Sequence, residues 1–365
     1  MERDRDKNRK ILEKIRGIEI HEYKSGLSVE EAERLYGVKA IKLASNENPY
    51  GPTPKVYDAL RNFSFFNVYP KEIPELKQAL ADYLGVEESR IVLGAGSDGV
   101  MDSIFKMFVD KGDEVIIPIP TFSYYHTLSS IYSARVINVE RREDFGIDVD
   151  AILNAVSNKT KLIFICSPNN PTGNSERFED VKAIVESVDC AVFIDEAYAE
   201  FADENLLKLS DYENVIISRT FSKAFGLANL RIGYAVMDEE LVKYYKAVSP
   251  PFPVSTIAQL CALQCLGDLE YMRDCVEKIK AERERLFREL KKRGIKAFPS
   301  QANFLFTKSP IKASEFVLEL IKRGVIVRDC SNFLGCDEFS VRVSVGKPEE
   351  NDAFLRALDD LLANL

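Results

Sequence analysis

Residues 161–167, KLIFICS, and residues 190–196, CAVFIDE, decide the fold class of this 365-residue chain. Both are short apolar runs bounded by turn residues. Similar runs recur through the first two thirds of the chain, namely RIVLG at 90–94, DEVIIP at 113–118, ARVINVE at 134–140, NVIISRT at 214–220 and RIGYAVM at 231–237. Helical periodicities such as PELKQALADYLG at 74–85 separate most of them. Strands that alternate with helices predict an α/β fold with a mostly parallel sheet covered by helices on both faces.

The last third of the chain has a different pattern. Residues 255–294 are long and helical, with Gly267 as the one interruption before Gly294 ends the helix. An amphipathic helix at 313–324 follows, and around it lie the short strands ANFLFT at 302–307, VIVRD at 325–329 and FSVRVSV at 339–345. This segment is long enough to form a second, smaller α+β domain.

We therefore expect three regions along the chain. Residues 1–45 would form an N-terminal arm with a helix, SVEEAERLYG at 28–37, that packs on the small domain. Residues 46–254 would form the large, ligand-binding domain, and residues 255–365 would form the small domain. Because no flexible Gly/Ser linker separates them, the two domains are expected to pack tightly.

The overall charge and hydropathy limit the function. The chain has 49 Lys and Arg against 58 Asp and Glu, and its net charge of −9 disfavours a broad nucleic-acid or anionic-membrane surface. No apolar run approaches the roughly 18 residues that a membrane helix needs. The charged N-terminus leads into no apolar signal core, so we expect a soluble, cytoplasmic protein.

The positions of histidine and cysteine in the sequence disfavour a catalytic or metal-binding role for them. The two histidines, His21 and His126, lie far apart in the sequence, which disfavours a metal site and a Ser-His-Asp triad. The seven cysteines are scattered without a C-x-x-C pair, as is typical of reduced thiols in a reducing compartment. We therefore expect chemistry that depends on Lys, Asp, Tyr and Arg, or on a bound cofactor.

The string GAGSDG at residues 94–99 follows a predicted strand and opens a helix. It matches the dinucleotide motif G-x-G-x-x-G, which also requires an acidic residue at the end of the next strand. That strand ends in Pro120 and Thr121, so a nicotinamide-dependent dehydrogenase is disfavoured. A Gly-rich turn before a helix still presents free N–H groups and a positive dipole end, which suit a phosphate.

Three further strings follow predicted strands. Lys223 lies among small hydroxyl and Gly residues in SRTFSKAFGL at 218–227. A Lys in such a place can lose its charge by desolvation and attack a carbonyl as an amine. Asp195 ends the apolar strand AVFID, and the turn SPNNPTG at 167–173 follows another strand. All four strings fall at the carboxyl ends of parallel strands, the edge at which open α/β sheets bind ligands.

Together the four strings resemble the pyridoxal-phosphate aminotransferases of the aspartate-aminotransferase fold, over nearly the whole chain. The resemblance implies that Lys223 forms a Schiff base with pyridoxal 5′-phosphate and later shuttles a proton between the substrate α-carbon and the cofactor. It implies that Asp195 pairs with the pyridine nitrogen, so that the ring acts as an electron sink. Asn170 and Tyr198 would hydrogen-bond the phenolic oxygen, and Phe122 would stack on the ring.

The same resemblance places the cofactor phosphate in the large domain. The residues that would surround it are Gly96, Ser97 and Asp98 on one side and Ser222 and Arg231 on the other. Tyr69 fits the tyrosine that the family sends from one subunit to the cofactor phosphate of the other. The active site would then require a homodimer.

Residues 43–52, LASNENPYGP, resemble the Asn-Glu-Asn-Pro motif of the histidinol-phosphate aminotransferases, and RTFSKAFGLANLRIGY at 219–234 matches the same family. VRVSVG at 341–346 also matches this family, and the resemblance implies that Arg342 binds the substrate. A guanidinium can hold phosphate or carboxylate in a two-pronged geometry. The resemblance implies further substrate contacts from Tyr23, Asn46, Asn48 and Arg328.

The activity implied is transfer of an amino group from L-histidinol phosphate to 2-oxoglutarate, as in histidine biosynthesis. Aromatic or broad-range aminotransferases share the cofactor residues, and related threonine-phosphate decarboxylases differ in the substrate bond that breaks, so both remain alternatives. A non-catalytic regulator with this fold usually carries an added DNA-binding domain, which the short N-terminal arm and the acidic charge disfavour. The expected partners are small-molecule substrates and a second copy of the chain.

Overall fold

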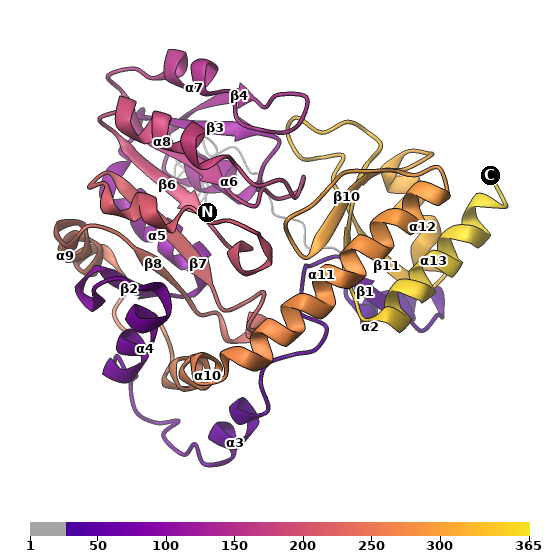
Figure 1. Cartoon of the computed structure of the whole chain (residues 1–365), viewed down its shortest axis with the longest axis horizontal. Helices are drawn as coiled ribbons and strands as arrows, with labels where there is room; N and C mark the ends of the chain where they lie inside the picture. Colours follow the sequence, from indigo (N-terminus) through magenta and orange to yellow (C-terminus); the bar gives the residue numbers. More distant parts are fainter. Residues whose placement is uncertain (1–26) are drawn as a thin grey trace, which may run out of the picture.

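The computed structural model describes residues 27–365, which contain two β-sheets (Figure 1). The larger sheet has the strand order β2-β8-β7-β6-β5-β3-β4. Its strands are β2 Ile91–Gly94, β3 Glu114–Ile119, β4 Arg135–Glu140, β5 Thr160–Cys166, β6 Ala191–Asp195, β7 Val215–Thr220 and β8 Gly233–Val236. Strand β8 runs opposite to the other six, so its pairs with β2 and β7 are antiparallel, and all other pairs are parallel. The mostly parallel sheet predicted from the alternating runs is confirmed.

Helices cover both faces of the larger sheet, because successive side chains of a strand point to opposite faces. In β3, Val115 and Ile117 belong to an apolar cluster with residues of α5, α6 and α9, whereas Ile116 belongs to another with residues of α7 and α8. These helices are α5 Gly96–Phe108, α6 Tyr124–Ile131, α7 Val149–Ala155, α8 Phe178–Ser187 and α9 Glu239–Val248. Among residues 27–365, no helix combines the length and the apolar character needed to span a bilayer.

The smaller sheet has the strand order β1-β11-β12-β10-β9. Its strands are β1 Ile41–Leu43, β9 Lys296–Ala297, β10 Phe304–Lys308, β11 Val325–Asp329 and β12 Ser340–Ser344, and the helices beside it include α2 Val29–Tyr36, α12 Ala313–Lys322 and α13 Pro348–Leu362. Strand β1 runs parallel to β11, so the chain contributes to this sheet before it enters the larger one. The sequence did not reveal β1, because three residues are too few to show a strand periodicity.

Helix α2 begins and ends where the sequence predicts. The Ser28 hydroxyl accepts a hydrogen bond from the Glu31 amide at 3.1 Å, and the Glu31 carboxylate accepts one from the Ser28 amide at 2.9 Å. Gly37 closes the helix with a φ of 67°, a conformation that glycine adopts without strain. The boundaries proposed at residues 45/46 and 254/255 stay a prediction.

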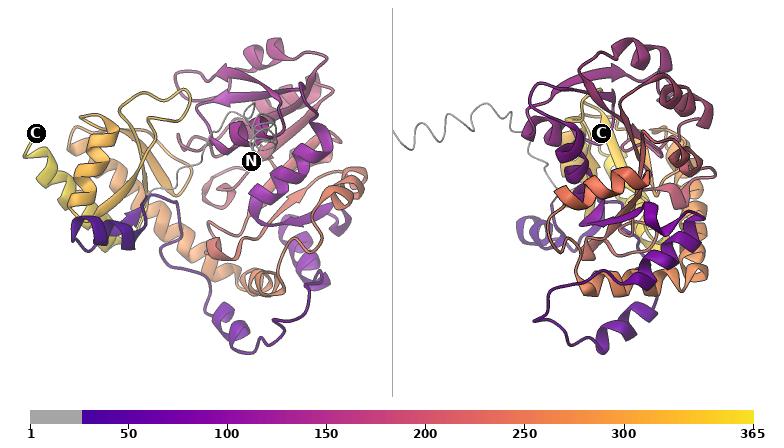
Figure 2. Two further views of the ribbon diagram at one scale, coloured as in Figure 1. Left: turned by 180° about the vertical axis from the view of Figure 1, so that it is seen from behind. Right: turned by 90° about the vertical axis from the view of Figure 1, so that its left-hand side faces the viewer.

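One long helix, α11 Leu269–Lys292, belongs to the cores of both sheets, and Figures 1 and 2 show it running between them. Met272 and Ile279 pack in a cluster with residues of the larger sheet, whereas Leu286 and Leu290 pack in the cluster of the smaller sheet. The preceding helix, α10 Thr256–Leu266, ends at Gly267, the interruption that the sequence indicates. Because α11 is one continuous helix, it couples the position of the smaller sheet to the larger one.

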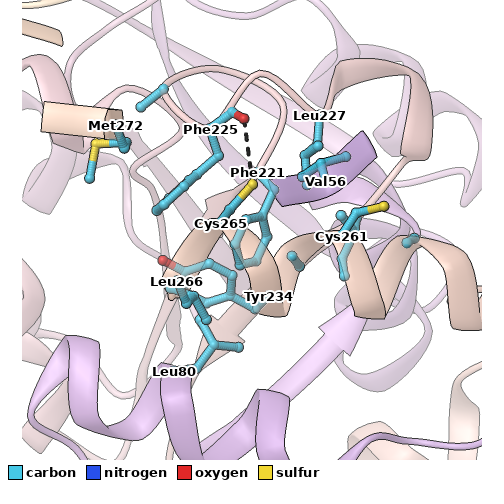
Figure 3. Packing of buried hydrophobic residues seen from close by; sticks show 14 of the residues in the cluster. Val56, Leu80, Phe221, Phe225, Leu227, Tyr234, Cys261, Cys265, Leu266 and Met272 are labelled. Carbon is cyan, nitrogen blue, oxygen red and sulfur yellow. Dashed lines mark hydrogen bonds between the residues drawn. The ribbon is translucent and has the colours of Figure 1, made fainter. Parts of the chain in front are cut away.

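The cluster around the first half of α11 also anchors a loop after β7, as Figure 3 shows. Phe221 and Phe225 are buried there beside Cys265, whose thiol donates a hydrogen bond to the Phe225 carbonyl at 3.8 Å. Burial of one such ring contributes about 1.5–3 kcal/mol. Since these rings flank Lys223, the apolar core holds both sides of the loop that carries it. The remaining helices are α3 Lys55–Arg61, α4 Pro74–Leu84 and the short η1 Glu88–Arg90, η2 Ala199–Phe201, η3 Leu207–Asp211 and η4 Ala228–Leu230.

Candidate active site

Strands β2, β5, β6 and β7 end at one edge of the larger sheet, where Cys166 is paired with Asp195 and Asp195 with Ser218. A cavity of about 300 Å³ lies at this edge, which is within the size range of small-molecule sites. It is lined by residues from both sheets: Ser45, Asn46, Ser97, Asp98, Phe122, Tyr124, Cys166, Asn170, Asp195, Ala197, Tyr198, Thr220, Ser222, Lys223, Arg231 and Arg342. Most of the residues predicted for the site are in this set.

Lys223 lies in the loop after β7. Its Nζ donates a hydrogen bond to the Ser45 carbonyl at 3.0 Å and lies 5.7 Å from the centroid of the Tyr198 ring. Burial, followed by the positive charge of Arg342, lowers the pKa of Lys223 from 10.5 to about 8. An appreciable fraction of the amine is therefore neutral near neutral pH, and the neutral amine can attack a carbonyl or accept a proton.

Asp195 ends β6 and is 4% exposed. Its Oδ2 accepts a hydrogen bond from the Tyr125 hydroxyl at 2.7 Å, and its Oδ1 accepts one from the Ala197 amide at 3.1 Å. Burial raises the pKa of Asp195 to about 6, although these two hydrogen bonds oppose the rise. The carboxylate is therefore ionised at neutral pH and fixed in direction, as a partner for a buried cation requires.

Tyr125 is a residue of this site that the sequence reasoning missed. It is fully buried on α6 and its ring stacks on Phe164 with the centroids 4.4 Å apart. The signal that could have found it is its place three residues after Phe122, on the helix that begins at the same edge of the sheet.

The first turn of α5 and Arg231 form the candidate phosphate site. The first N–H groups of a helix have no partner within it, and at the start of α5, at Gly96, no N-cap side chain accepts a hydrogen bond from them. A Cβ atom on Gly96 would lie 2.7 Å from Nη2 of Arg231, so only glycine allows the guanidinium this close to the helix end. Arg231 also pairs with Asp98 at 2.8 Å. Because this pair is nearly half exposed, water weakens it, and an anion can compete for the guanidinium.

Asn46 and Arg342 bring groups from the smaller sheet to the same cavity. Asn46 Nδ2 donates a hydrogen bond to the Tyr198 hydroxyl at 3.0 Å. Arg342 donates hydrogen bonds to Asn170 Oδ1 and to the Ala44 carbonyl. Its buried Nε has no acceptor among the described residues, so this guanidinium retains a donor for a ligand.

Some of the residues predicted to bind substrate do not line the cavity. Asn48 is buried and donates a hydrogen bond to the Ala224 carbonyl at 2.8 Å, so it supports the loop of Lys223. Arg328 is buried with its guanidinium 5.6 Å from the centroid of the Phe333 ring. Tyr23 lies outside the described residues.

Tyr69 also lies away from the cavity of its own chain. Its side chain is 76% exposed and stacks on Phe252 with the ring centroids 4.8 Å apart. The large exposed apolar residues near it in sequence are Tyr57, Leu60, Phe65, Phe66 and Val68.

Sequence reasoning missed several lining residues, namely Ser45, Tyr124, Cys166, Ala197 and Thr220. Cys166 lies at the end of β5, and burial raises the pKa of its thiol to about 12. It is therefore part of the cavity wall and not a nucleophile, since the thiolate is the reactive form.

These residues fit pyridoxal phosphate. Its phosphate needs an anion-binding helix end, its aldehyde an amine, and its ring nitrogen a carboxylate. The first turn of α5 with Arg231, the amine of Lys223 and the carboxylate of Asp195 line the cavity and could meet these three needs. Fold and site together define a pyridoxal-phosphate-dependent enzyme.

Comparison with known proteins agrees with this class. A family model for aminotransferase class I and II matches residues 38–358. The chain therefore belongs to the class I and II aminotransferases. Relatives 52% and 42% identical to it over most of the chain show that, within this class, it belongs to the histidinol-phosphate aminotransferases. The family, the enzyme class and the cofactor inferred from the strand-end strings are confirmed.

Three relatives show how far the likeness extends. Histidinol-phosphate aminotransferase 1 of Archaeoglobus fulgidus is 52% identical over 88% of this chain and 99% of its own length. The histidinol-phosphate aminotransferase of Methanocaldococcus jannaschii is 42% identical over 97% of this chain and 99% of its own length. The crystal structure of the Sinorhizobium meliloti histidinol-phosphate aminotransferase, in complex with pyridoxal-5′-phosphate, has a TM-score of 0.84 at 28% identity and covers 94% of this chain and 96% of that one.

Proposed function

We propose that this aminotransferase transfers the amino group of L-histidinol phosphate to 2-oxoglutarate, giving imidazole acetol phosphate and L-glutamate, in histidine biosynthesis. One observation above all supports transamination as the reaction type: Lys223, Asp195 and Arg342 line the same cavity. The names of the relatives at 52% and 42% identity support the choice of amino donor. The cytoplasmic location stays a prediction.

Each residue of the cavity would have a distinct role in the reaction. Lys223 Nζ would accept the proton of the substrate α-carbon, because its lowered pKa leaves part of the amine neutral. Asp195 would hold a negative charge against the pyridine nitrogen, and Asn170 and Tyr198 would bind the phenolic oxygen. Bound pyridoxal phosphate supplies the aldehyde for the amino group and a ring that acts as an electron sink.

Arg342 would bind the anionic group of each substrate. Its donors meet the cavity where the smaller sheet faces Asn170 of the larger one. A guanidinium pairs with phosphate and with carboxylate through two parallel hydrogen bonds. One arginine can therefore serve the phosphorylated donor in the first half-reaction and the dicarboxylic acceptor in the second.

The enzyme would work as a homodimer in which Tyr69 reaches the cofactor phosphate of the partner subunit. The exposed side chains of Phe65, Phe66, Tyr69 and Phe252 support this proposal, since an apolar surface of this kind is typical of a protein interface. Each active site would then combine Lys223 of one subunit with a tyrosine of the other.

Mixing two inactive variants tests the dimer. We expect Lys223→Ala and Tyr69→Ala subunits, refolded together, to form mixed dimers with one intact site each, and transamination should exceed the sum of the separate variants. Sedimentation measures the dimer itself. Mixed dimers with no gain in activity would show that Tyr69 serves its own subunit or none.

A panel of amino donors tests the substrate. We expect histidinol phosphate to react with the bound cofactor, as followed by its absorbance, at a kcat/KM at least about 100-fold above that of phenylalanine or tyrosine. Phenylalanine and tyrosine present only an α-carboxylate to Arg342 and place their side chains differently in the cavity. Equal values would favour a broad-range aminotransferase. Release of carbon dioxide from threonine phosphate would favour the decarboxylase.

A further inference from the structure

A buried polar cluster lies beside the cavity without lining it. Its members are Arg141, Asn169 and Glu176, and the mechanism above uses none of them. The side chains of Arg141 and Glu176 are each 1% exposed, and Asn169 is 0% exposed. A buried charged pair costs desolvation energy, so its position calls for a physical explanation.

Arg141, the residue after β4, donates to four separate acceptors. Its Nε donates to the Pro120 carbonyl at 3.1 Å, and its Nη2 donates to Asn169 Oδ1 at 3.1 Å. Its Nη1 donates to the Phe145 carbonyl at 2.8 Å and to the Glu176 carboxylate. One planar guanidinium thus joins the loops that follow β3, β4 and β5.

Asn169 reinforces the same connection. Its Nδ2 donates to the Pro120 carbonyl at 3.0 Å and to Thr172 Oγ1 at 2.7 Å. Its Oδ1 accepts a hydrogen bond from Thr121 Oγ1 at 2.7 Å, in addition to the one from Arg141. Arg141 and Asn169 therefore bind the same carbonyl and bind each other.

This cluster is hydrogen-bonded to two loops that reach the cavity. Phe122 lies two residues after Pro120, and Asn170 follows Asn169 directly. Both Phe122 and Asn170 line the cavity, from loops that follow the adjacent strands β3 and β5.

We propose that Arg141, with Asn169 and Glu176, is a positioning group that fixes the separation between Phe122 and Asn170. Phe122 would contact the face of the cofactor ring and Asn170 its phenolic oxygen, so the cluster would set how the ring sits in the cavity. The inference rests on the cofactor part of the proposed function and is independent of the amino donor. A misplacement of about 1 Å at such a contact can cost on the order of 100-fold in rate.

A pair of matched variants tests the proposal. Glu176→Gln removes one of the two acceptor oxygens that serve Arg141 and the Ile147 amide. Glu114→Gln is the control, because Glu114 is also buried and hydrogen-bonded, to Arg135 and Ser157, at the opposite end of β3. Both variants should lower the melting temperature, since both disturb a buried carboxylate.

Only Glu176→Gln should change the cofactor site. We expect about tenfold weaker binding of pyridoxal phosphate to the apo-protein and a reduced visible circular dichroism of the bound cofactor, because its ring would lose its fixed orientation. Arg141→Lys should have the same effect, since one ammonium cannot reach the four acceptors of a guanidinium. Thr121→Val, which removes only the hydroxyl bonded to Asn169, provides a milder variant if the charged ones do not fold.

Equal cofactor affinity and equal circular dichroism in Glu176→Gln and Glu114→Gln would overturn the inference and leave the cluster a purely stabilising role. If the charged variants do not fold, unchanged cofactor binding in Thr121→Val would overturn it in the same way. A wild-type protein that binds no pyridoxal phosphate would instead overturn the proposed function.

Discussion

The two sides of the cavity are built differently. The cofactor side, defined here by Ser97, Asn170, Asp195 and Lys223, comes from residues at or just after the ends of strands in the larger sheet. The substrate side, defined by Asn46 and Arg342, comes from the segment after β1 and from β12 of the smaller sheet. One side therefore depends on a single sheet edge, and the other exists only where two sheets meet.

This difference separates two kinds of effect. A change on the cofactor side should impair every reaction of the enzyme, because all substrates use the same cofactor. A change on the substrate side should mainly alter the binding of anionic substrates, and it should affect the cofactor only through the charge that Arg342 places near Lys223. The four variants and conditions below test that separation, in order of decreasing effect.

Replacement of Lys223 should have the largest effect. We expect Lys223→Ala to lower transamination at least about 1,000-fold with every donor, because the variant lacks both the attacking amine and the proton acceptor. Initial rates with several donors measure this, and Lys182→Ala on the surface of α8 is the control. Borohydride reduction that labels a lysine other than Lys223 would contradict the assignment.

Arg342→Lys should have the second largest effect and should spare the cofactor. We expect about a 100-fold lower kcat/KM for both the phosphorylated donor and the dicarboxylic acceptor, because an ammonium lacks the two-pronged geometry. Arg328→Lys is a suitable control, since Arg328 lies opposite Arg342 in the sheet but does not line the cavity. A lower kcat/KM for only one of the two substrates would show that different residues bind the anionic group in the two half-reactions.

Removal of the Tyr125 hydroxyl should have a moderate effect on the cofactor side. Burial holds the pKa of Asp195 at about 6, and the Tyr125 hydrogen bond opposes a further rise. Below this pH the carboxylate is protonated, so cofactor affinity should fall as pH decreases. In Tyr125→Phe the fall should occur at higher pH. Binding near pH 6 should be about three- to sevenfold weaker, because the lost hydrogen bond contributes about 1–1.5 kcal/mol and the wild-type carboxylate is itself half protonated at this pH.

Titrations of pyridoxal phosphate binding across pH measure this change. Tyr132→Phe is the control, because Tyr132 at the end of the same helix donates to Asp102, which does not line the cavity. An unshifted profile in Tyr125→Phe would mean that Tyr125 does not tune Asp195.

The pH dependence of cofactor uptake should reveal the smallest effect. Because the folded pKa of Lys223 is lowered to about 8, its neutral form increases as pH rises through that value, and uptake by the apo-protein should accelerate with a midpoint there. Burial is the main cause and Arg342 the next, so Arg342→Gln should move the midpoint upward. Stopped-flow absorbance measures the rates of uptake. An unchanged midpoint in Arg342→Gln would show that the charge of Arg342 does not influence the pKa of Lys223.

Much of the cofactor side could be predicted because each residue is close in sequence to the strand that positions it. Asp195 ends an apolar run and Lys223 follows another, so the pattern of strands placed both at one edge. Tyr125 has only a weak local signal, its place three residues after Phe122, and Arg141 has none. Their importance depends on partners in other loops, Asp195 for one and Pro120 and Asn169 for the other.

The sequence by itself determined the parallel sheet, the strand-end strings and the family, because each depends on hydrophobic periodicity and residues near one another in the chain. Only the tertiary structure decided that Asn46 contacts Tyr198, that Arg342 contacts Asn170, and that Tyr69 stays away from its own cavity. These contacts join segments separated by much of the chain, and they form when burial of α11 in both cores brings the smaller sheet against the larger. Such packing depends on the summed shape of many side chains, which no short stretch of sequence contains.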